Sequence, residues 1–195
     1  MMFHRAPGEL QSELAEMDEC MPHYYKVTQN HGQGAETIMR AEALFCQGRC
    51  TDAHIELERA YAQVKNNGQI NMALCCDFLS RRLSRDTDVE QQYTFAERYA
   101  ELLRYHDASW INLWSATSAY YHALRGETDK IPEIFSQHRL SDVNILAPGK
   151  PMMEMIENQV YLAEGAYAKV IGRSAELLAV CEAMHYALVA LHLRI

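Results

Sequence analysis

The sequence predicts an all-α protein in which about four helix pairs stack into a superhelix. Three observations support this prediction. Glycine and proline contribute only 9 and 5 of the 195 residues, too few for the many tight turns of an all-β fold. Apolar residues recur at steps of three and four, the period of an amphipathic helix. Small-residue or acidic turns recur at intervals of 38, 40 and 39 residues, counted from Gly48, Asp86, Gly126 and Gly165.

The composition excludes several classes of protein. The net charge of −8 argues against direct binding of DNA or RNA, because phosphate contacts need a basic surface. The longest stretch without a charged residue, 108–124, contains Ser, Thr and Asn and is no transmembrane span. The N-terminal residues 1–8 lack the apolar core of a signal peptide. We therefore expect a cytoplasmic protein that contacts neither membrane nor nucleic acid.

The predicted elements follow one another along a single domain, 1–195. We expect a leading helix over 8–21, and then a surface loop over His23–Lys26, because this segment after Pro22 has no clear periodicity. The helix pairs and the start of a further helix are expected at 35–67, 69–105, 108–138, 151–184 and 186–195. The second helix of the third pair depends on Ile131, Ile134 and Phe135. Around Gly165, the segment 160–171 also allows a β-hairpin.

The turn residues suit the ends of helices. Gly48, Gly126 and Gly165 can adopt the positive φ that terminates a helix. Side-chain oxygens of Thr51 or Asp52, and of Asp129, can cap the helix that follows the turn. Pro151 suits the first turn of the first helix in the fourth pair.

Two alanines identify the kind of helix pair. Ala53 and Ala60 lie five and twelve residues after Gly48, where small side chains let two helices approach closely. This spacing is typical of tetratricopeptide repeats, although the interval here is longer than their usual 34 residues. A generic helical hairpin with small contact residues would give the same pattern. We expect a tetratricopeptide-like α-α superhelix.

Further residues resemble one family of proteins. The segments 7–10, 17–26, 31–36 and 40–43, together with Ala53, Ala60, 69–70 and 78–79, resemble the helical-repeat region of MalT-like, LuxR-family transcriptional regulators. The resemblance implies a sensor that binds an effector or partner and changes how the regulator assembles. These regulators also have an ATPase module and a helix-turn-helix. The sequence shows neither a phosphate-binding Gly-x4-Gly-Lys-Ser/Thr motif nor a basic recognition segment, so we expect no ATP or DNA binding by this chain.

The six cysteines are expected to be reduced and mostly buried, without disulfides. Cys46, Cys50 and His54 have a spacing of four residues that invites comparison with a zinc site. The turn at Gly48 breaks the single helical face, and no second cluster completes four ligands. We expect no metal and no cofactor.

The candidate ligand site follows from the repeat. Glu42, Ser80, Tyr120 and Gln159 each lie six residues before a turn, on the side of the first helix expected to face a concave groove. Trp110 and Trp114 add an aromatic platform on which sugars or peptides could stack, or else a core stripe. These six residues are the predicted ligand-binding site.

The remaining motifs do not indicate catalysis. The loop 31–35 contains Gly32 and Gly34, but it lacks the third glycine and the Lys-Ser/Thr of a phosphate loop; a backbone anion site at the following helix is the alternative. No catalytic Ser-His-Asp or paired-carboxylate signature is present in the sequence. We expect a non-catalytic sensor. The rival hypotheses are a free-standing adaptor that binds a peptide segment and a cysteine-metal hydrolase.

The C-terminal residues have an apolar helical pattern. Ala187, Leu188, Leu191 and Leu193 start a further helix, and no polar cap follows it. Because terminal repeats need a polar outer face, we expect a segment of a longer array that forms a homodimer through this helix.

Overall fold

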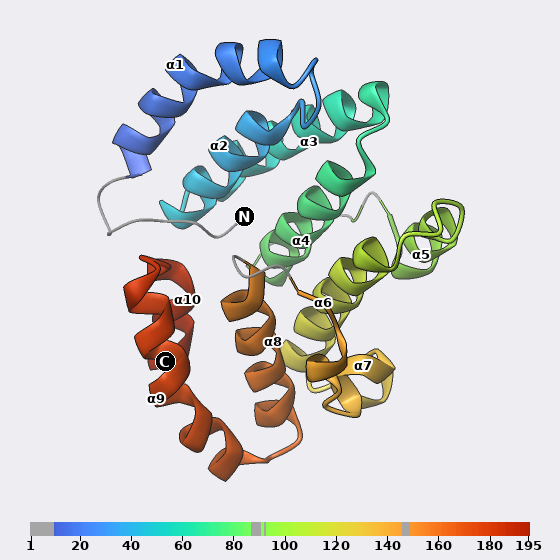
Figure 1. Cartoon of the computed structure of the whole chain (residues 1–195), viewed down its shortest axis with the longest axis vertical. Helices are drawn as coiled ribbons and strands as arrows, with labels where there is room; N and C mark the ends of the chain where they lie inside the picture. Colours follow the sequence, from blue (N-terminus) through green and yellow to red (C-terminus); the bar gives the residue numbers. More distant parts are fainter. Residues whose placement is uncertain (1–9, 87–90, 92, 146–148) are drawn as a thin grey trace. The chain divides into compact units, whose positions relative to one another are not determined.

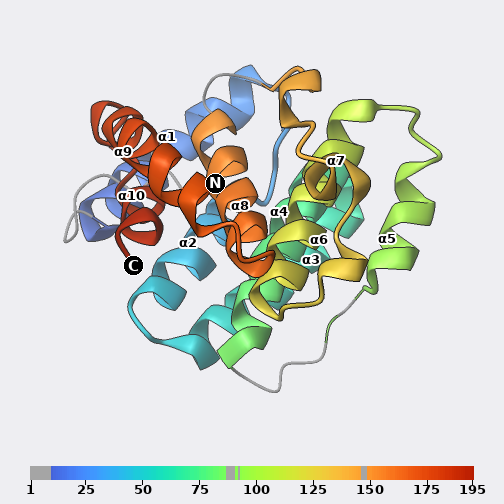
Figure 2. The ribbon, with the colours of Figure 1, turned by 90° about the horizontal axis from the view of Figure 1, so that it is seen from below.

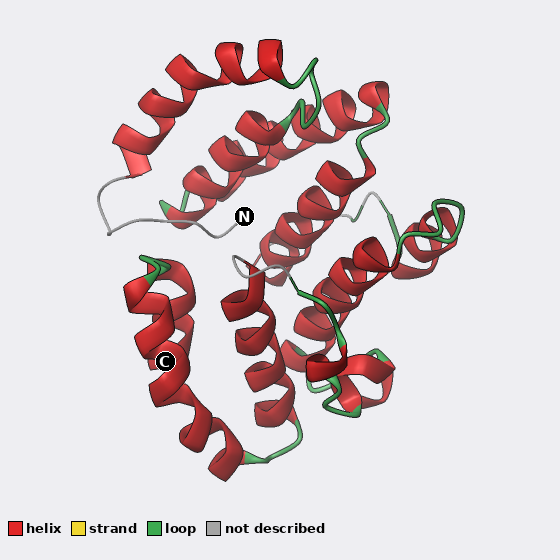
Figure 3. Cartoon of the chain, viewed as in Figure 1, coloured by secondary structure: helices red, strands yellow, loops and turns green. Residues whose placement is uncertain are grey.

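The chain folds into two compact units, Gly8–Thr94 and Phe95–Ile195. The computed structural model describes residues 10–86, 91, 93–145 and 149–195. Within these residues every regular element is a helix and none is a strand, as Figure 3 shows. The all-α prediction is confirmed for this part of the chain. The boundary between the units falls inside the predicted second pair, 69–105.

The described residues of the first unit form four helices, which are labelled in Figure 1. They are α1 (Leu10–Val27), α2 (Ala35–Cys46), α3 (Cys50–Asn67) and α4 (Ile70–Asp86). Helices α2 and α3 form a hairpin, α4 packs against both of them, and α1 packs on α2. Ala53 and Ala60 are fully buried in this unit, as their role as small contact residues requires. The predicted turn at 86–88 begins at the last residue of α4, and Thr87 and Asp88 lie outside the described residues.

The prediction for the first helix is wrong at its C-terminal end. Helix α1 continues to Val27, so His23–Lys26 are helical and not a loop. Pro22 lies inside the helix. A proline removes one backbone hydrogen bond, but it does not prevent the following residues from remaining helical.

The second unit contains six α-helices and two short 3₁₀-helices in its described residues. They are α5 (Phe95–Leu102), α6 (Ala108–Leu124), η1 (Thr128–Lys130), α7 (Glu133–Ser136), η2 (Leu140–Asp142), α8 (Lys150–Ala163), α9 (Tyr167–Ala183) and α10 (Ala187–Arg194). Helix α8 packs against α6 and α9, and α10 packs against α8 and α9. Figure 2 shows α9 and α10 side by side from a second direction.

One predicted helix is replaced by short turns. The second helix of the third pair, expected around Ile131, Ile134 and Phe135, is reduced to η1, the four residues of α7, and η2. Pro132, which has no backbone N–H and a ψ of 145°, lies between η1 and α7 and interrupts any longer helix. Ile131 and Phe135 are nevertheless buried, so the apolar pattern correctly identifies them as core residues. The alternative hairpin over 160–171 is wrong, because α8 and α9 occupy that segment.

The glycine turns have the predicted backbone. Gly48, Gly126 and Gly165 have φ of 75°, 69° and 75°. The predicted caps are wrong: α3 begins after Arg49 without a side-chain cap, and Asp129 lies within η1. Pro151 does lie in the first turn of α8.

Histidines occupy three further left-handed turns, at His106, His138 and His185, with φ of 53°, 54° and 58°. These turns were not predicted, because histidine adopts positive φ less readily than glycine and so is a weaker signal for such a turn. Stacking of the pairs into one superhelix involves both units and stays a prediction. No helix among the described residues combines the length and apolarity needed to cross a membrane.

Candidate functional site

The two predicted site residues of the first unit are buried. The side chain of Glu42 is 4% exposed and forms an ion pair with Arg82 at 2.5 Å. The guanidinium of Arg82 also lies 4.9 Å from the centre of the Phe45 ring. The Ser80 hydroxyl donates a hydrogen bond to Gln91 Oε1 at 3.0 Å. In this unit the two residues therefore contact protein partners within the fold.

The cysteines differ from the expectation of mostly buried thiols. All six are free, but only Cys76 and Cys181 are buried, while Cys20 and Cys46 are exposed. Partial burial is the main cause of the raised pKa of the Cys46 thiol. Among the described residues, no group of three or more His, Cys, Asp or Glu side chains is placed to hold a metal ion.

The glycine-containing loop 31–35 is tied down by side chains. The Gly32 N–H donates to Gln69 Oε1 at 3.1 Å, and the Gly34 N–H donates to the Tyr25 hydroxyl at 3.3 Å. Tyr25 in turn donates to Glu36, and burial is the main reason why its pKa is raised. These two backbone N–H groups thus already have partners within the protein, which argues against an anion site that uses them.

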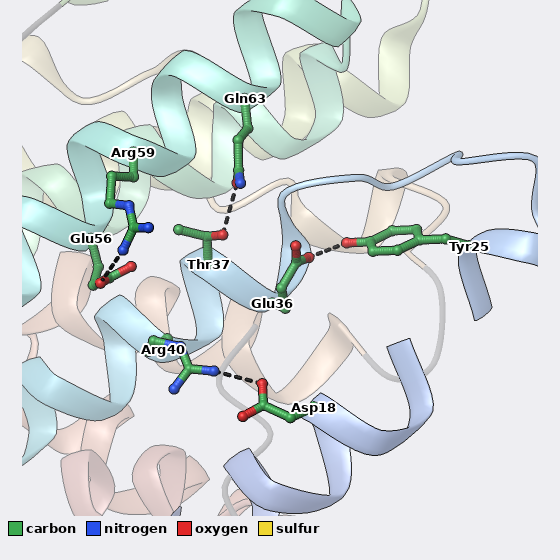
Figure 4. Close-up of polar contacts among 8 residues, drawn as sticks. All are labelled: Asp18, Tyr25, Glu36, Thr37, Arg40, Glu56, Arg59 and Gln63. Carbon is green, nitrogen blue, oxygen red and sulfur yellow. Dashed lines mark hydrogen bonds and ion pairs between the residues drawn. The ribbon is translucent and has the colours of Figure 1, made fainter. Parts of the chain in front are cut away.

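Figure 4 shows the Tyr25–Glu36 contact together with other polar contacts between the first three helices. Asp18 of α1 forms an ion pair with Arg40 of α2 at 2.6 Å. The Thr37 hydroxyl of α2 donates to Gln63 Oε1 of α3 at 2.7 Å. Polar contacts between helices therefore contribute to holding α1 and α2 in place. Burial of the apolar side chain of Met17 on α1 adds to them.

The predicted site residues of the second unit lie on two helices, Trp110, Trp114 and Tyr120 on α6 and Gln159 on α8. Trp114 donates from its indole N–H to the Phe95 carbonyl at 3.1 Å, and Trp110 packs edge-on against Tyr105. Both tryptophans are half-buried, whereas Tyr120 is 4% exposed. Gln159 is half-buried on α8. The six residues do not form one site within either unit, and their ligand-binding role stays a prediction.

The second unit contains a pocket of about 560 Å³ that the sequence analysis did not identify. Its walls come from α8, from Arg173 of α9, and from the segment 138–145, which follows α7 and contains η2. The lining residues are His138, Leu140, Ser141, Val143, Asn144, Ile145, Lys150, Glu154, Glu157, Tyr161 and Arg173.

A second pocket, of about 440 Å³, is lined by α8 and α9. The two pockets share Lys150, Glu154 and Arg173. The remaining lining residues are Pro151, Glu176, Leu177, Val180 and Met184. We call the two pockets together the α8–α9 groove.

Paired charges and a tyrosine form the polar centre of the groove. Arg173 forms an ion pair with Glu157 at 2.5 Å, and Lys150 lies 3.6 Å from Glu154. The Tyr161 ring stacks on His138, with 4.1 Å between ring centres and an interplanar angle of 17°. Burial and the nearby Glu157 carboxylate raise the pKa of Tyr161. The centre is thus both polar and held in a defined geometry.

The spacing of polar residues along α8 could have indicated this groove from the sequence. Lys150, Glu154, Glu157 and Tyr161 are separated by three or four residues, so they lie on one face of α8. Gln159 is two residues, or roughly 200°, from both Glu157 and Tyr161, which places it on the opposite face. The sequence signal for this side of the groove was therefore a row of polar residues on one face of an otherwise largely buried helix. The contribution of 138–145 had no such signal, because this segment lies almost entirely between the predicted third and fourth pairs, which end at 138 and begin at 151.

Two buried polar groups in the second unit lack hydrogen-bond partners among the described residues. They are the side-chain amide of Asn158, which is 2% exposed, and Nδ1 of His138. The other ring nitrogen of His138 lies 3.0 Å from Glu164. Buried polar atoms without partners are uncommon and destabilising, so they mark positions where a water or ligand atom would be favourable.

Comparisons with known proteins add no relative. No family model matches the chain, and neither a curated protein nor a solved structure matches it.

Proposed function

We propose that the chain is a non-catalytic helical sensor module that binds an effector or a partner in the α8–α9 groove. The observation that carries the proposal is the groove itself, two adjoining pockets of about 560 and 440 Å³ around a shared charged centre. Volumes of this size suit the binding of small molecules or short peptide segments. The charged side chains pair with one another, an arrangement suited to orienting a ligand.

The resemblance to MalT-like regulators suggests the context of this sensor. In that context the protein is cytoplasmic, and a bound ligand changes the contacts of the module with neighbouring modules. The groove is suited to such a role because three segments form it: α8, α9 and 138–145. A ligand that touches all three favours the conformation in which they are close together.

A thermal-shift screen tests the proposal. Sugars, oligosaccharides and peptides are each added to the whole chain. A ligand at about 100 times its Kd stabilises the folded state by about 2.7 kcal/mol. For a chain of this size, each kcal/mol raises Tm by roughly 2–4 °C.

A matched pair of variants locates the binding site. Val180 lines the groove and is 42% exposed, so Val180→Asp should impair binding while the fold persists. Ile171 is on the same helix and 75% exposed, but it is nine residues away and thus roughly 180° around the helix. Ile171→Asp should therefore keep the shift. If no compound class raises Tm, or if both variants respond like the parent chain, the proposal is contradicted.

A further inference from the structure

We propose that Asn67 is a site of spontaneous deamidation, and that the product weakens the contact between Gln69 and the loop 31–35. The reactive pair is Asn67, the last residue of α3, and Gly68, which follows it. The backbone of the chain attacks its own side chain, so that no enzyme is needed. The inference concerns the first unit and does not depend on the α8–α9 groove.

The reaction is an internal displacement followed by hydrolysis. The backbone nitrogen of Gly68 attacks the side-chain carbonyl carbon of Asn67, and the new C–N bond closes a five-membered imide. The side-chain nitrogen takes up the proton of the Gly68 N–H and leaves as ammonia. Water then adds to either carbonyl of the imide and breaks one C–N bond. The product is aspartate, or isoaspartate, in which the main chain runs through the side-chain carboxyl and is one atom longer.

The surroundings of this pair favour ring closure. Asn67 is the one asparagine of the sequence that glycine follows, and any other residue would place a Cβ beside the attacking nitrogen. The space around Gly68 is open, because an added Cβ would meet no described atom within 4 Å. Both residues are exposed, so water can reach the imide. Among the described residues, no hydrogen bond holds the Asn67 side chain.

The backbone at the end of α3 must open before the ring can close. Ring closure requires ψ of Asn67 to rotate away from the helical value of about −42°. Two hydrogen bonds oppose this rotation: Gly68 N–H donates to the Lys65 carbonyl at 3.4 Å, and Gln69 N–H donates to the Val64 carbonyl at 3.1 Å. The first is longer than the usual range of about 2.7–3.2 Å. One ordinary hydrogen bond changes an equilibrium by about tenfold in water.

Side-chain packing adds little to the stability of this turn. Val64 is the last buried residue of α3, and residues 65–68 are all exposed. Helix ends with few buried contacts open at a low cost in free energy. We therefore expect Asn67 in the folded chain to react at a rate within about tenfold of its rate in the unfolded chain.

The modification would also affect the loop 31–35. Gln69 is two residues after Asn67, and its Oε1 accepts the hydrogen bond from the Gly32 N–H at 3.1 Å. Isoaspartate lengthens the main chain between α3 and Gln69, which shifts this side chain. We expect the hydrogen bond to be lost and the Gly32 amide to exchange its hydrogen about tenfold faster.

The test follows the full chain by mass spectrometry during incubation in water enriched in a heavy oxygen isotope. Hydrolysis of the imide incorporates one heavy oxygen atom, which separates reaction during incubation from reaction during sample preparation. Trypsin releases the peptide 66–81, and electron-transfer fragmentation assigns the label to Asn66, Asn67 or Asn71. We expect the label at Asn67, and more of it at mildly alkaline pH, because the attacking nitrogen must lose its proton. The unfolded reference is the same chain in guanidinium chloride.

Two variants separate the chemistry from the fold. Asn67→Gln keeps the amide but would have to close a six-membered ring, so the label at this position should be lost. Gly68→Asn adds a Cβ beside the attacking nitrogen and should slow the reaction several-fold. Asparagine tolerates the φ of 63° found at this position better than most residues do. Tm of both variants is compared with that of the parent chain, so that a change in rate is separated from a loss of fold.

The effect on the loop is measured on the purified product. Deamidation adds one negative charge, so ion exchange separates the modified chain from the parent. The reference is Asn67→Asp, which has the same charge but a main chain of normal length. Hydrogen exchange at Gly32 should be faster in the modified chain than in this variant. Equal exchange would show that the contact with Gln69 survives and would overturn the second part of the inference.

Two results would overturn the first part of the inference. One is a rate at Asn67 no higher than at Asn66, which is also exposed but is followed by another asparagine. The other is a rate in the folded chain more than about tenfold below the rate in guanidinium chloride, because the end of α3 would then protect the site. Neither result bears on ligand binding in the α8–α9 groove.

Discussion

Removing one partner of the buried ion pair in the first unit should strongly destabilise the fold. Glu42 and Arg82 are 4% and 5% exposed at their side chains and 2.5 Å apart. Glu42→Leu leaves the Arg82 guanidinium buried between Phe45 and Phe78 without its carboxylate. Breaking a buried pair in this way costs about 3–5 kcal/mol. The prediction matters for function because Glu42 was expected to contact a ligand.

The double variant Glu42→Leu/Arg82→Met separates the loss of the Glu42–Arg82 attraction from a mere packing defect. With both charges removed, the desolvation penalty disappears, and replacement of a buried pair by apolar residues is often neutral. We therefore expect the double variant to recover most of the lost free energy of unfolding. Urea denaturation followed by circular dichroism measures the loss, and hydrogen exchange in α2, α3 and α4 assigns it to the first unit. A cost below about 1 kcal/mol for Glu42→Leu would refute the reasoning, since an exposed pair contributes that little.

Three further predictions concern turns, charge and association. Hydrogen bonds from His122 and Arg125 lower the pKa of Glu127 from 4.5 to about 2. The contribution of the Glu127 carboxylate to stability is therefore complete above pH 4.5 and is lost as the pH falls towards 2. When Tm is measured as a function of acid pH, Glu127→Gln should lack this pH-dependent contribution. Gly34→Ala should lower the free energy of unfolding, measured by urea denaturation, more than Gly48→Ala does. The new Cβ would lie 3.2 Å from Val64 at Gly34 (φ 101°), whereas Gly48 (φ 75°) has open space around it. Equal losses for the two variants would contradict this prediction. Leu191 is 50% exposed on α10, so Leu191→Glu should shift a dimer towards monomer in sedimentation equilibrium, and a parent chain that is already monomeric would refute dimerisation through this helix.

The periodic parts of the chain were the predictable ones. Steps of three and four residues identify α2, α3, α8 and α9, because each buries one face, and Gly48 and Gly165 end helices where the sequence indicates. At two prolines the predicted extent of a helix was wrong: one helix is longer than expected and the other is shorter. Pro22 was expected to end a helix and lies inside one, whereas Pro132 interrupts a helix that the apolar residues had predicted. The outcome depends on packing around the proline, which sequence spacing does not report.

The groove was hard to predict for a related reason. Its α8 face has a regular spacing of polar residues, but another wall is the segment 138–145, which contains only the short η2 and lies between the predicted third and fourth pairs. Glu42, Ser80 and Tyr120, chosen for their place in the repeat, are buried. A position equivalent in the repeat is therefore not necessarily equivalent in exposure to solvent.

His138 connects the backbone of the second unit with the wall of its groove. The residue has a φ of 54°, a conformation that glycine adopts at lower cost, and its ring stacks on Tyr161 at 4.1 Å. His138→Gly would relax the backbone and at the same time remove the ring that immobilises the tyrosine. Relief of the positive φ and loss of the stacked ring therefore have opposite effects on the free energy of unfolding, while only the loss of the ring changes the wall of the proposed groove.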